Sequence, residues 1–184
     1  MKKWIVATAV ALTMASTASV SASMEIGLGF NKPVGDDQQL GGAAGGGLGL
    51  AVRILRPMND NLLLTGHAGL ISFGGSKTVE MLLGNVFQAE ANYYGIPVTV
   101  GGRYYLQGVD TGGLFIKGNA GLLYKMATFE VNVMGEKDDD SENEAGFYVS
   151  PGIGFDFGRV NVTADYNLGN EDWTWFALNA AYRF

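Results

Sequence analysis

The last stretch of the chain, Trp173–Phe184, reads WTWFALNAAYRF. From Phe176 to Phe184 every second side chain is apolar, and Asn179 and Arg183 lie on the intervening face. This period of two is typical of a β-strand with one apolar and one polar face. A strand of this kind that closes on an aromatic residue predicts a membrane-spanning β-barrel, which meets lipid on its outside and encloses a polar interior.

The first 22 residues have the features of a secretory signal peptide. Lysines follow the first methionine, an apolar stretch runs from Trp4 to Met14, and Val20-Ser21-Ala22 is a small-residue cleavage site. The alternative is a membrane anchor, but this stretch is short for a span of about 20 residues. We therefore predict a cleaved signal peptide at 1–22 and a barrel domain at 23–184.

Composition excludes several function classes. Removal of the two lysines in the signal changes the formal net charge from −6 to −8, and a negative chain is a poor nucleic-acid binder. The absence of cysteine excludes disulfides and thiolate chemistry. Apolar residues are abundant (47%), but after the signal they are dispersed by alternation, which excludes helical membrane spans.

Eight alternating segments are visible in the mature chain. Each is near or above the ~9–11 residues that a tilted strand needs to cross a bilayer, and an even number suits a single-chain bacterial barrel. We predict an all-β, eight-stranded, antiparallel up-and-down barrel with strands at about 24–31, 46–56, 61–73, 91–106, 113–131, 145–157, 159–168 and 173–184.

The connections between these segments alternate in length, which predicts the orientation. Barrels of this type have short periplasmic turns and longer outer loops. The short turns are 57–60, 107–112 and the turn at Gly158, so both termini are expected in the periplasm. The outer loops are then expected at about 32–45, 74–90, 132–144 and 169–172.

Aromatic residues near the strand ends predict the two membrane interfaces, because Tyr and Trp favour that boundary. The expected periplasmic set is Tyr104, Tyr105, Phe155, Phe157, Tyr182 and Phe184, and the expected outer set is Tyr124, Phe147, Trp173 and Trp175.

Several strands together resemble the small eight-stranded outer-membrane barrels, the group of the OmpA transmembrane domain, OmpX and OmpW. The resemblance covers the whole mature chain and is carried by YGIPVTVGGRYY (94–105), GNAGLLY (118–124), PGIGF (151–155) and AYRF (181–184). It implies location in the outer membrane of a Gram-negative bacterium. It also implies that Tyr182 and Phe184 form the signal that the barrel-assembly machinery reads, although Ala177 and Asn179 depart from the family's usual residues.

Charged residues on the inward face form an expected polar network in the lumen. Buried charges persist only when they are paired. We predict that Glu25 pairs with Arg53 and Arg183, and that Lys117 pairs with Asp156. The whole predicted network contains Glu25, Arg53, Arg103, Lys117, Asp156, Asp165 and Arg183. The structural interpretation is a lumen filled by salt bridges, and the alternative is a charged, gated conduit.

No catalytic, cofactor-binding or metal-binding residues are predicted. His67 is the single histidine; it is expected at mid-membrane on the lumen face, with no serine beside it, and is interpreted as structural. The acidic stretch 135–144 lacks the internal glycine of a calcium loop. The glycine-rich stretch 41–49 lacks the residues of a phosphate loop.

The first functional hypothesis is a structural or surface-interaction barrel that serves envelope integrity, adhesion or lipopolysaccharide contact through its outer loops. The second is an OmpW-like transport barrel for small molecules, and the third and weakest is a lipid-modifying enzyme. The expected partners are outer-membrane lipid, lipopolysaccharide and the barrel-assembly machinery, with no cofactor, no nucleic acid and a monomeric state. Fold alone does not choose between these roles.

Overall fold

The computed structural model describes residues 22–34, 45–80, 86–133, 136–169 and 173–184, with the side chains of 75–91 and 129–142 left out of the description. Residues 1–21 of the predicted signal peptide lie outside it. The strands are β1 (Ser23–Pro33), β2 (Gly47–Pro57), β3 (Leu62–Glu80), β4 (Val86–Tyr105), β5 (Gly113–Val133), β6 (Glu136–Asp156), β7 (Val160–Gly169) and β8 (Thr174–Arg183).

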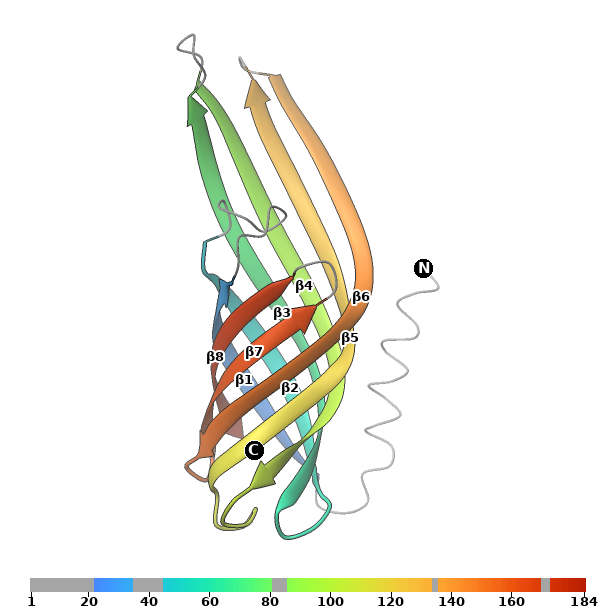
Figure 1. Ribbon diagram of the computed structural model, residues 1–184, viewed down its shortest axis with the longest axis vertical. Helices are drawn as coiled ribbons and strands as arrows, with labels where there is room; N and C mark the ends of the chain where they lie inside the picture. The colour runs from blue at the N-terminus through green and yellow to red at the C-terminus, as the bar shows by residue number, and fades with distance from the viewer. Residues whose placement is uncertain (1–21, 35–44, 81–85, 134–135, 170–172) are drawn as a thin grey trace.

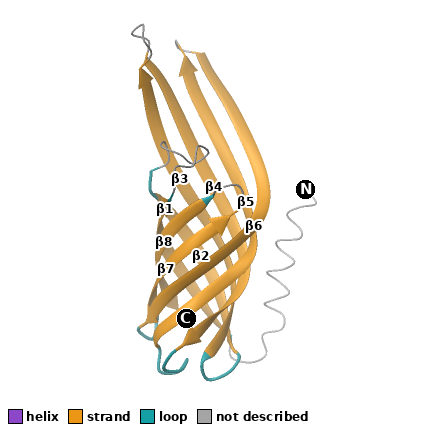
Figure 2. Ribbon diagram, in the orientation of Figure 1, coloured by secondary structure: helices purple, strands orange, loops and turns teal. Residues whose placement is uncertain are grey.

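Each strand pairs antiparallel with its neighbour in sequence, and β1 pairs with β8, so the sheet closes into a barrel (Figures 1 and 2). Closure leaves no open edge in lipid. Among the described residues, no helix has the length and apolar character needed to span a membrane. The predicted eight-stranded antiparallel fold is confirmed.

Where side chains are described, they alternate between the inside and the outside of the barrel along the strands. In β1, Glu25 is buried inside, whereas Ile26, Leu28 and Phe30 are exposed on the outer surface. Apolar residues in the same outward position continue around the barrel, among them Leu48, Leu122 and Leu178. A surface of this kind is stable in a lipid environment.

The barrel wall has very uneven height. The strands β3 to β6 rise far beyond β1, β2, β7 and β8 as two long hairpins, which stand at the top of Figure 1. The β3–β4 ladder continues to the Glu80–Val86 pair, and the β5–β6 ladder continues to Val133–Glu136.

The outer loops expected at 74–90 and 132–144 are therefore wrong, because strand covers most of both segments. Strands pair through their backbone groups, so a ladder can continue beyond the lipid whatever its side chains are. Beyond the lipid both faces of a strand can be polar, so the alternation that marks a membrane strand is absent there. Of the other two expected loops, residues 35–44 and 170–172 lie outside the described residues.

The two ends of the described chain lie at the same end of the barrel. The Phe184 amide donates to the Met24 carbonyl at 2.9 Å. The predicted short turns are also at this end, between β2 and β3, β4 and β5, and β6 and β7. The last of these turns places Gly158 at a φ of 95°, which glycine adopts without steric cost.

Candidate functional site in the barrel interior

The interior near the chain ends is organised around one buried carboxylate, that of Glu25, which is 0% exposed. Arg103 donates to both of its oxygens, with Nη1–Oε1 at 2.9 Å and Nη2–Oε2 at 2.6 Å. Arg183 donates through Nη2 at 3.0 Å, and the Arg53 Nη1 atom lies 3.9 Å from Oε2. The Asn161 amide adds a hydrogen bond of 2.8 Å.

Strand register explains two of these three arginines. Arg53 on β2 and Arg183 on β8 lie directly opposite Glu25 on β1, so both partners that the sequence predicts for Glu25 are present. Arg103 comes from β4, two strands beyond β2 in the barrel order, and reaches Glu25 through the lumen. Its inward position is readable from the alternation, but its partner depends on barrel shear, which no strand shows by itself.

A second carboxylate, Asp156, extends this group of residues. Its Oδ2 atom accepts hydrogen bonds from Arg183 Nη2 at 2.6 Å and from the Tyr105 hydroxyl at 2.8 Å. We call the whole group the Glu25 cluster; it contains Glu25, Arg53, Arg103, Tyr105, Asp156, Asn161 and Arg183.

The predicted pairing of Lys117 with Asp156 is wrong, because Lys117 pairs with Asp165 at 2.7 Å. Lys117 on β5 lies opposite Gly152 on β6, and Gly152 lies opposite Asp165 on β7. Since glycine has no side chain, the lysine can reach across β6 to the next strand. Asp165 also accepts from the Asn179 amide at 2.8 Å.

The opposite end of the interior is apolar and aromatic. We call this group the Trp175 cluster; it contains Ile71, Phe73, Tyr93, Leu123, Tyr148, Trp173, Trp175 and Ala177, all of them buried. Trp175 stacks on Tyr148 with ring centroids 5.4 Å apart and meets Phe73 edge-on at 6.0 Å. Such ring pairs stabilise a packed core beyond the effect of area burial alone.

The predicted positions of three aromatic residues at the membrane interfaces are wrong. Trp173 and Trp175 were predicted at the outer interface and Tyr105 at the periplasmic one, but all three point into the barrel. Their positions along the strands put them on the inward face, where an aromatic side chain fills a small barrel. By contrast, Tyr104 and Phe147 are exposed on the outside.

Glycines on the inward face give these large side chains their space. A Cβ atom on Gly154 would collide with the Phe115 ring, and one on Gly152 would collide with the Asp165 carboxylate. Phe115 is fully buried and packs against Tyr105 at a centroid distance of 5.0 Å. Small and large residues are thus matched across neighbouring strands.

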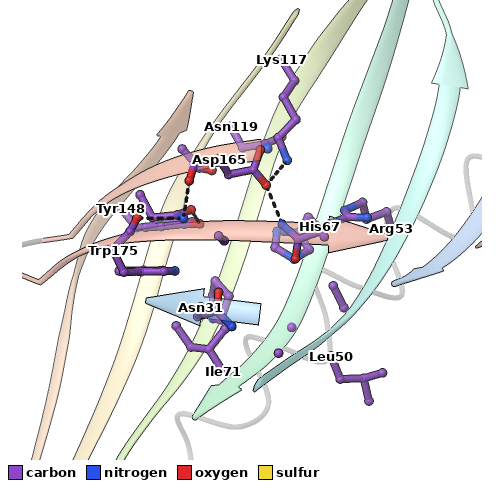
Figure 3. Close-up of a pocket in the computed structure, with 18 residues that line it drawn as sticks. Asn31, Leu50, Arg53, His67, Ile71, Lys117, Asn119, Tyr148, Asp165 and Trp175 are labelled. Atoms are coloured by element: carbon purple, nitrogen blue, oxygen red, sulfur yellow. Dashed lines mark hydrogen bonds and ion pairs between the residues drawn. The ribbon is translucent and has the colours of Figure 1, made fainter. Parts of the chain in front are cut away.

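Between the two clusters lies a cavity of about 30 Å³ (Figure 3). Its lining includes Arg53 from the Glu25 cluster and Trp175 from the aromatic end, together with Asn31, His67 and Asp165. Among the described residues, three buried atoms at this cavity have no hydrogen-bond partner: Asn31 Nδ2, Arg53 Nη1 and Asp165 Oδ1.

His67 lies on the wall of this cavity, in the lumen as predicted. Its Nδ1 atom is 3.3 Å from the Thr99 hydroxyl oxygen on the neighbouring strand. Ser150 lines the same cavity from β6, but the side chain in contact with the His67 ring is that of Thr99. The residues are distant in sequence, so only the closed barrel brings them together.

The two residues of the predicted assembly signal are on the outer surface of β8. Tyr182 and Phe184 are both exposed and contact each other edge-on, with ring centroids 5.0 Å apart. The Arg159 guanidinium donates to the Tyr182 hydroxyl at 3.3 Å.

The acidic stretch 135–144 and the glycine-rich stretch 41–49 lie partly outside the described side chains. Of the acidic stretch 135–144, Glu144 is described, and it accepts a hydrogen bond from Lys125 at 3.3 Å. Of the glycine-rich stretch 41–49, residues 41–44 lie outside the description, and Gly47 begins β2.

A closed barrel of eight antiparallel strands, apolar outside and polar or aromatic inside, defines the small integral outer-membrane barrels. The model of the outer membrane protein beta-barrel domain family matches residues 5–184. The chain belongs to this family of outer-membrane barrels of Gram-negative bacteria.

Solved structures show the same fold. The chain is similar to Ail, the attachment invasion locus protein of Yersinia pestis, with 19% identity, a TM-score of 0.57, and coverage of 89% of this chain and 97% of that one. Ail in complex with the heparin analogue sucrose octasulfate matches at 19% identity, with a TM-score of 0.53 and the same coverage. Neisserial surface protein A matches at 14% identity, with a TM-score of 0.45 and coverage of 88% and 95%. No curated protein sequence matches significantly.

Proposed function

We propose that the protein is a non-enzymatic structural and surface-interaction barrel whose lumen is closed. In this proposal both chain ends face the periplasm and the β3–β4 and β5–β6 hairpins face the outside. Short turns at the end that holds the chain ends and long hairpins at the other support this orientation. The protein is a monomer that contacts outer-membrane lipid and lipopolysaccharide.

The closed lumen is supported by one observation: side chains fill the barrel interior from both ends. The Glu25 cluster occupies one end, the Trp175 cluster occupies the other, and the cavity between them is only about 30 Å³. A space of that size holds a few water molecules rather than a continuous water column.

Single-channel conductance of the refolded protein in a planar bilayer tests this proposal. We expect no steady open level for the wild type. Glu25→Ala leaves Arg103 without a carboxylate partner and removes one of the two carboxylate partners of Arg183, so it should either produce openings or destabilise the barrel by about 3–5 kcal/mol, less where the lumen is wet. Asp110→Ala, at an exposed turn, is the matched control. Stable wild-type openings would contradict the closed lumen.

The long hairpins support the surface-interaction role. Residues 129–144 of the β5–β6 hairpin contain seven acidic residues and one lysine, a formal charge of −6. Ail binds a sulfated heparin analogue in one solved complex. A segment of charge −6 repels sulfate groups, so we propose that this chain's surface partner is cationic.

Binding to immobilised heparin and to immobilised polylysine at low salt tests the sign of the partner. We expect retention on polylysine that is lost at high salt, and no retention on heparin. Retention on heparin alone would contradict the proposed partner charge without affecting the closed lumen.

The enzymatic alternative has weaker support. His67 and Ser150 share the small interior cavity, but the His67 ring contacts the Thr99 hydroxyl. A catalytic base must reach a substrate proton, and a lipid cannot enter a space of about 30 Å³ between two packed clusters.

A further inference from the structure

Among the residues that the structure describes, the charges inside the barrel do not balance. In the Glu25 cluster and the Lys117–Asp165 pair, four cations face three carboxylates, which leaves one formal positive charge in excess (4 − 3 = 1). Lys125 does not alter this sum, since it pairs with Glu144.

Of these four cations, Arg53 lies farthest from its carboxylate partner. Arg103 and Arg183 contact Glu25 at 2.6 Å and 3.0 Å, whereas Arg53 stands 3.9 Å away. The Arg53 residue is 5% exposed, and its Nη1 atom has no hydrogen-bond partner among the described residues. A buried cation with so weak a partner is unfavourable unless another anion compensates it.

The cavity beside Arg53 supplies the space for that anion. Asn31 Nδ2, a second buried donor that has no hydrogen-bond partner within the described part of the chain, belongs to the same lining (Figure 3). Water could satisfy single atoms, and we expect it at Asp165 Oδ1, but water carries no charge. The volume of about 30 Å³ admits a small ion and excludes larger organic anions.

We propose that the cavity binds one small monovalent anion of halide size, held by Arg53 Nη1 with Asn31 Nδ2 as an additional donor. The anion completes the interior charge balance and couples β1 and β2 to the centre of the lumen. This inference concerns an internal site and does not depend on the surface partner or on the conductance.

Urea unfolding of the refolded protein in sodium chloride, compared with sodium gluconate at equal ionic strength, tests the site. Gluconate is too large for the cavity. We expect a saturable, chloride-specific rise in the unfolding midpoint, and chloride at 100 times its dissociation constant should raise the folded-to-unfolded ratio about 100-fold.

Three variants locate the effect. Arg53→Leu should abolish the chloride-specific rise, and Ala51→Val should weaken it by filling the cavity that Ala51 lines. Arg159→Leu removes the same charge at an exposed turn and should keep the full rise. An equal chloride effect in all variants would overturn the proposal.

Bromide in crystals of the wild type gives a test that needs no variant to fold. An anomalous peak within hydrogen-bond distance of Arg53 Nη1 is the expected result. Water density alone at this position, or the absence of any chloride-specific rise in the wild type, overturns the site.

Discussion

At the residue scale, one buried carboxylate, that of Glu25, has several cationic partners. Glu25 receives Arg103 in a two-point contact and also Arg183. Two-point arginine–carboxylate contacts are among the stronger charge-assisted hydrogen bonds. Removal of one partner from such a group leaves the others buried and unpaired, which costs more than the pair itself contributes.

An experiment can distinguish the observed Lys117–Asp165 pair from the Lys117–Asp156 pair that the sequence predicts. A double-mutant cycle of Lys117→Met and Asp165→Asn should show a coupling of about 0.5–3 kcal/mol, because the two side chains are 2.7 Å apart. Urea unfolding of the four proteins measures it.

The control cycle combines Lys117→Met with Asp156→Asn. Asp156 has its own partners, Arg183 and Tyr105, so these two changes should add within about 0.5 kcal/mol. A larger coupling in the control cycle than in the Asp165 cycle would contradict the observed pairing.

Parity along a strand predicts which charged residues point inward, and register predicts the neighbours of Glu25. Neither parity nor register predicts a contact that passes over a glycine position to the next strand or that spans the lumen. Lys117 reaches Asp165 because Gly152, which lies between them, has no side chain. Arg103 reaches Glu25 from β4, a strand that does not adjoin β1. Both contacts depend on barrel shear and side-chain size together.

At the element scale, alternation identifies a strand only where one face meets lipid. It therefore locates all eight strands but misses the outer ends of three of them. The expected strands stop at 73 and begin at 91 and 145, whereas β3 runs to Glu80, β4 begins at Val86 and β6 begins at Glu136. The same alternation predicts that apolar residues lie on the outer, lipid-facing surface. Trp173 and Trp175 break this rule because a narrow lumen can bury aromatic rings as well as polar groups.

The exposed end of β8 predicts a role for Phe184 in assembly rather than stability. Phe184→Ala keeps the backbone hydrogen bond to Met24 and removes a side chain that is 67% exposed. Folded yield in cells should fall several-fold, while stability after refolding in detergent should change by about 0.5 kcal/mol or less.

Phe157→Ala is the control for Phe184→Ala, because this turn phenylalanine is 66% exposed at the same end of the barrel. It should lower neither the cellular yield nor the refolded stability. Equal losses in yield for the two variants would mean that the assembly machinery does not read Phe184.

The β5–β6 hairpin can be shortened without opening the barrel. Thr128 and Ser141 are paired across the ladder, so deletion of 129–140 with an Asn-Gly turn inserted between them leaves matched strands. The variant should keep wild-type unfolding in urea and lose retention on polylysine. Full retention would assign the surface interaction to another part of the molecule.

At the scale of the whole molecule, the barrel combines a closed ladder with an interior packed at both ends. Such a structure should resist SDS until heated, so boiled and unboiled samples should migrate differently in gels. Cell fractionation should recover the protein with outer-membrane markers. Recovery as a soluble periplasmic species would contradict the membrane location.

The matching of glycines with large side chains has a consequence for how this interior can change over generations. Gly95→Ala alone would drive a methyl group into the Ile71 side chain on the neighbouring strand, yet the same change beside Ile71→Ala would find room. In each such pair, the residue at the glycine position can become larger only if the facing side chain becomes smaller. Descendants of this barrel should therefore drift freely on the lipid side while their lumens change by reciprocal exchanges between adjacent strands.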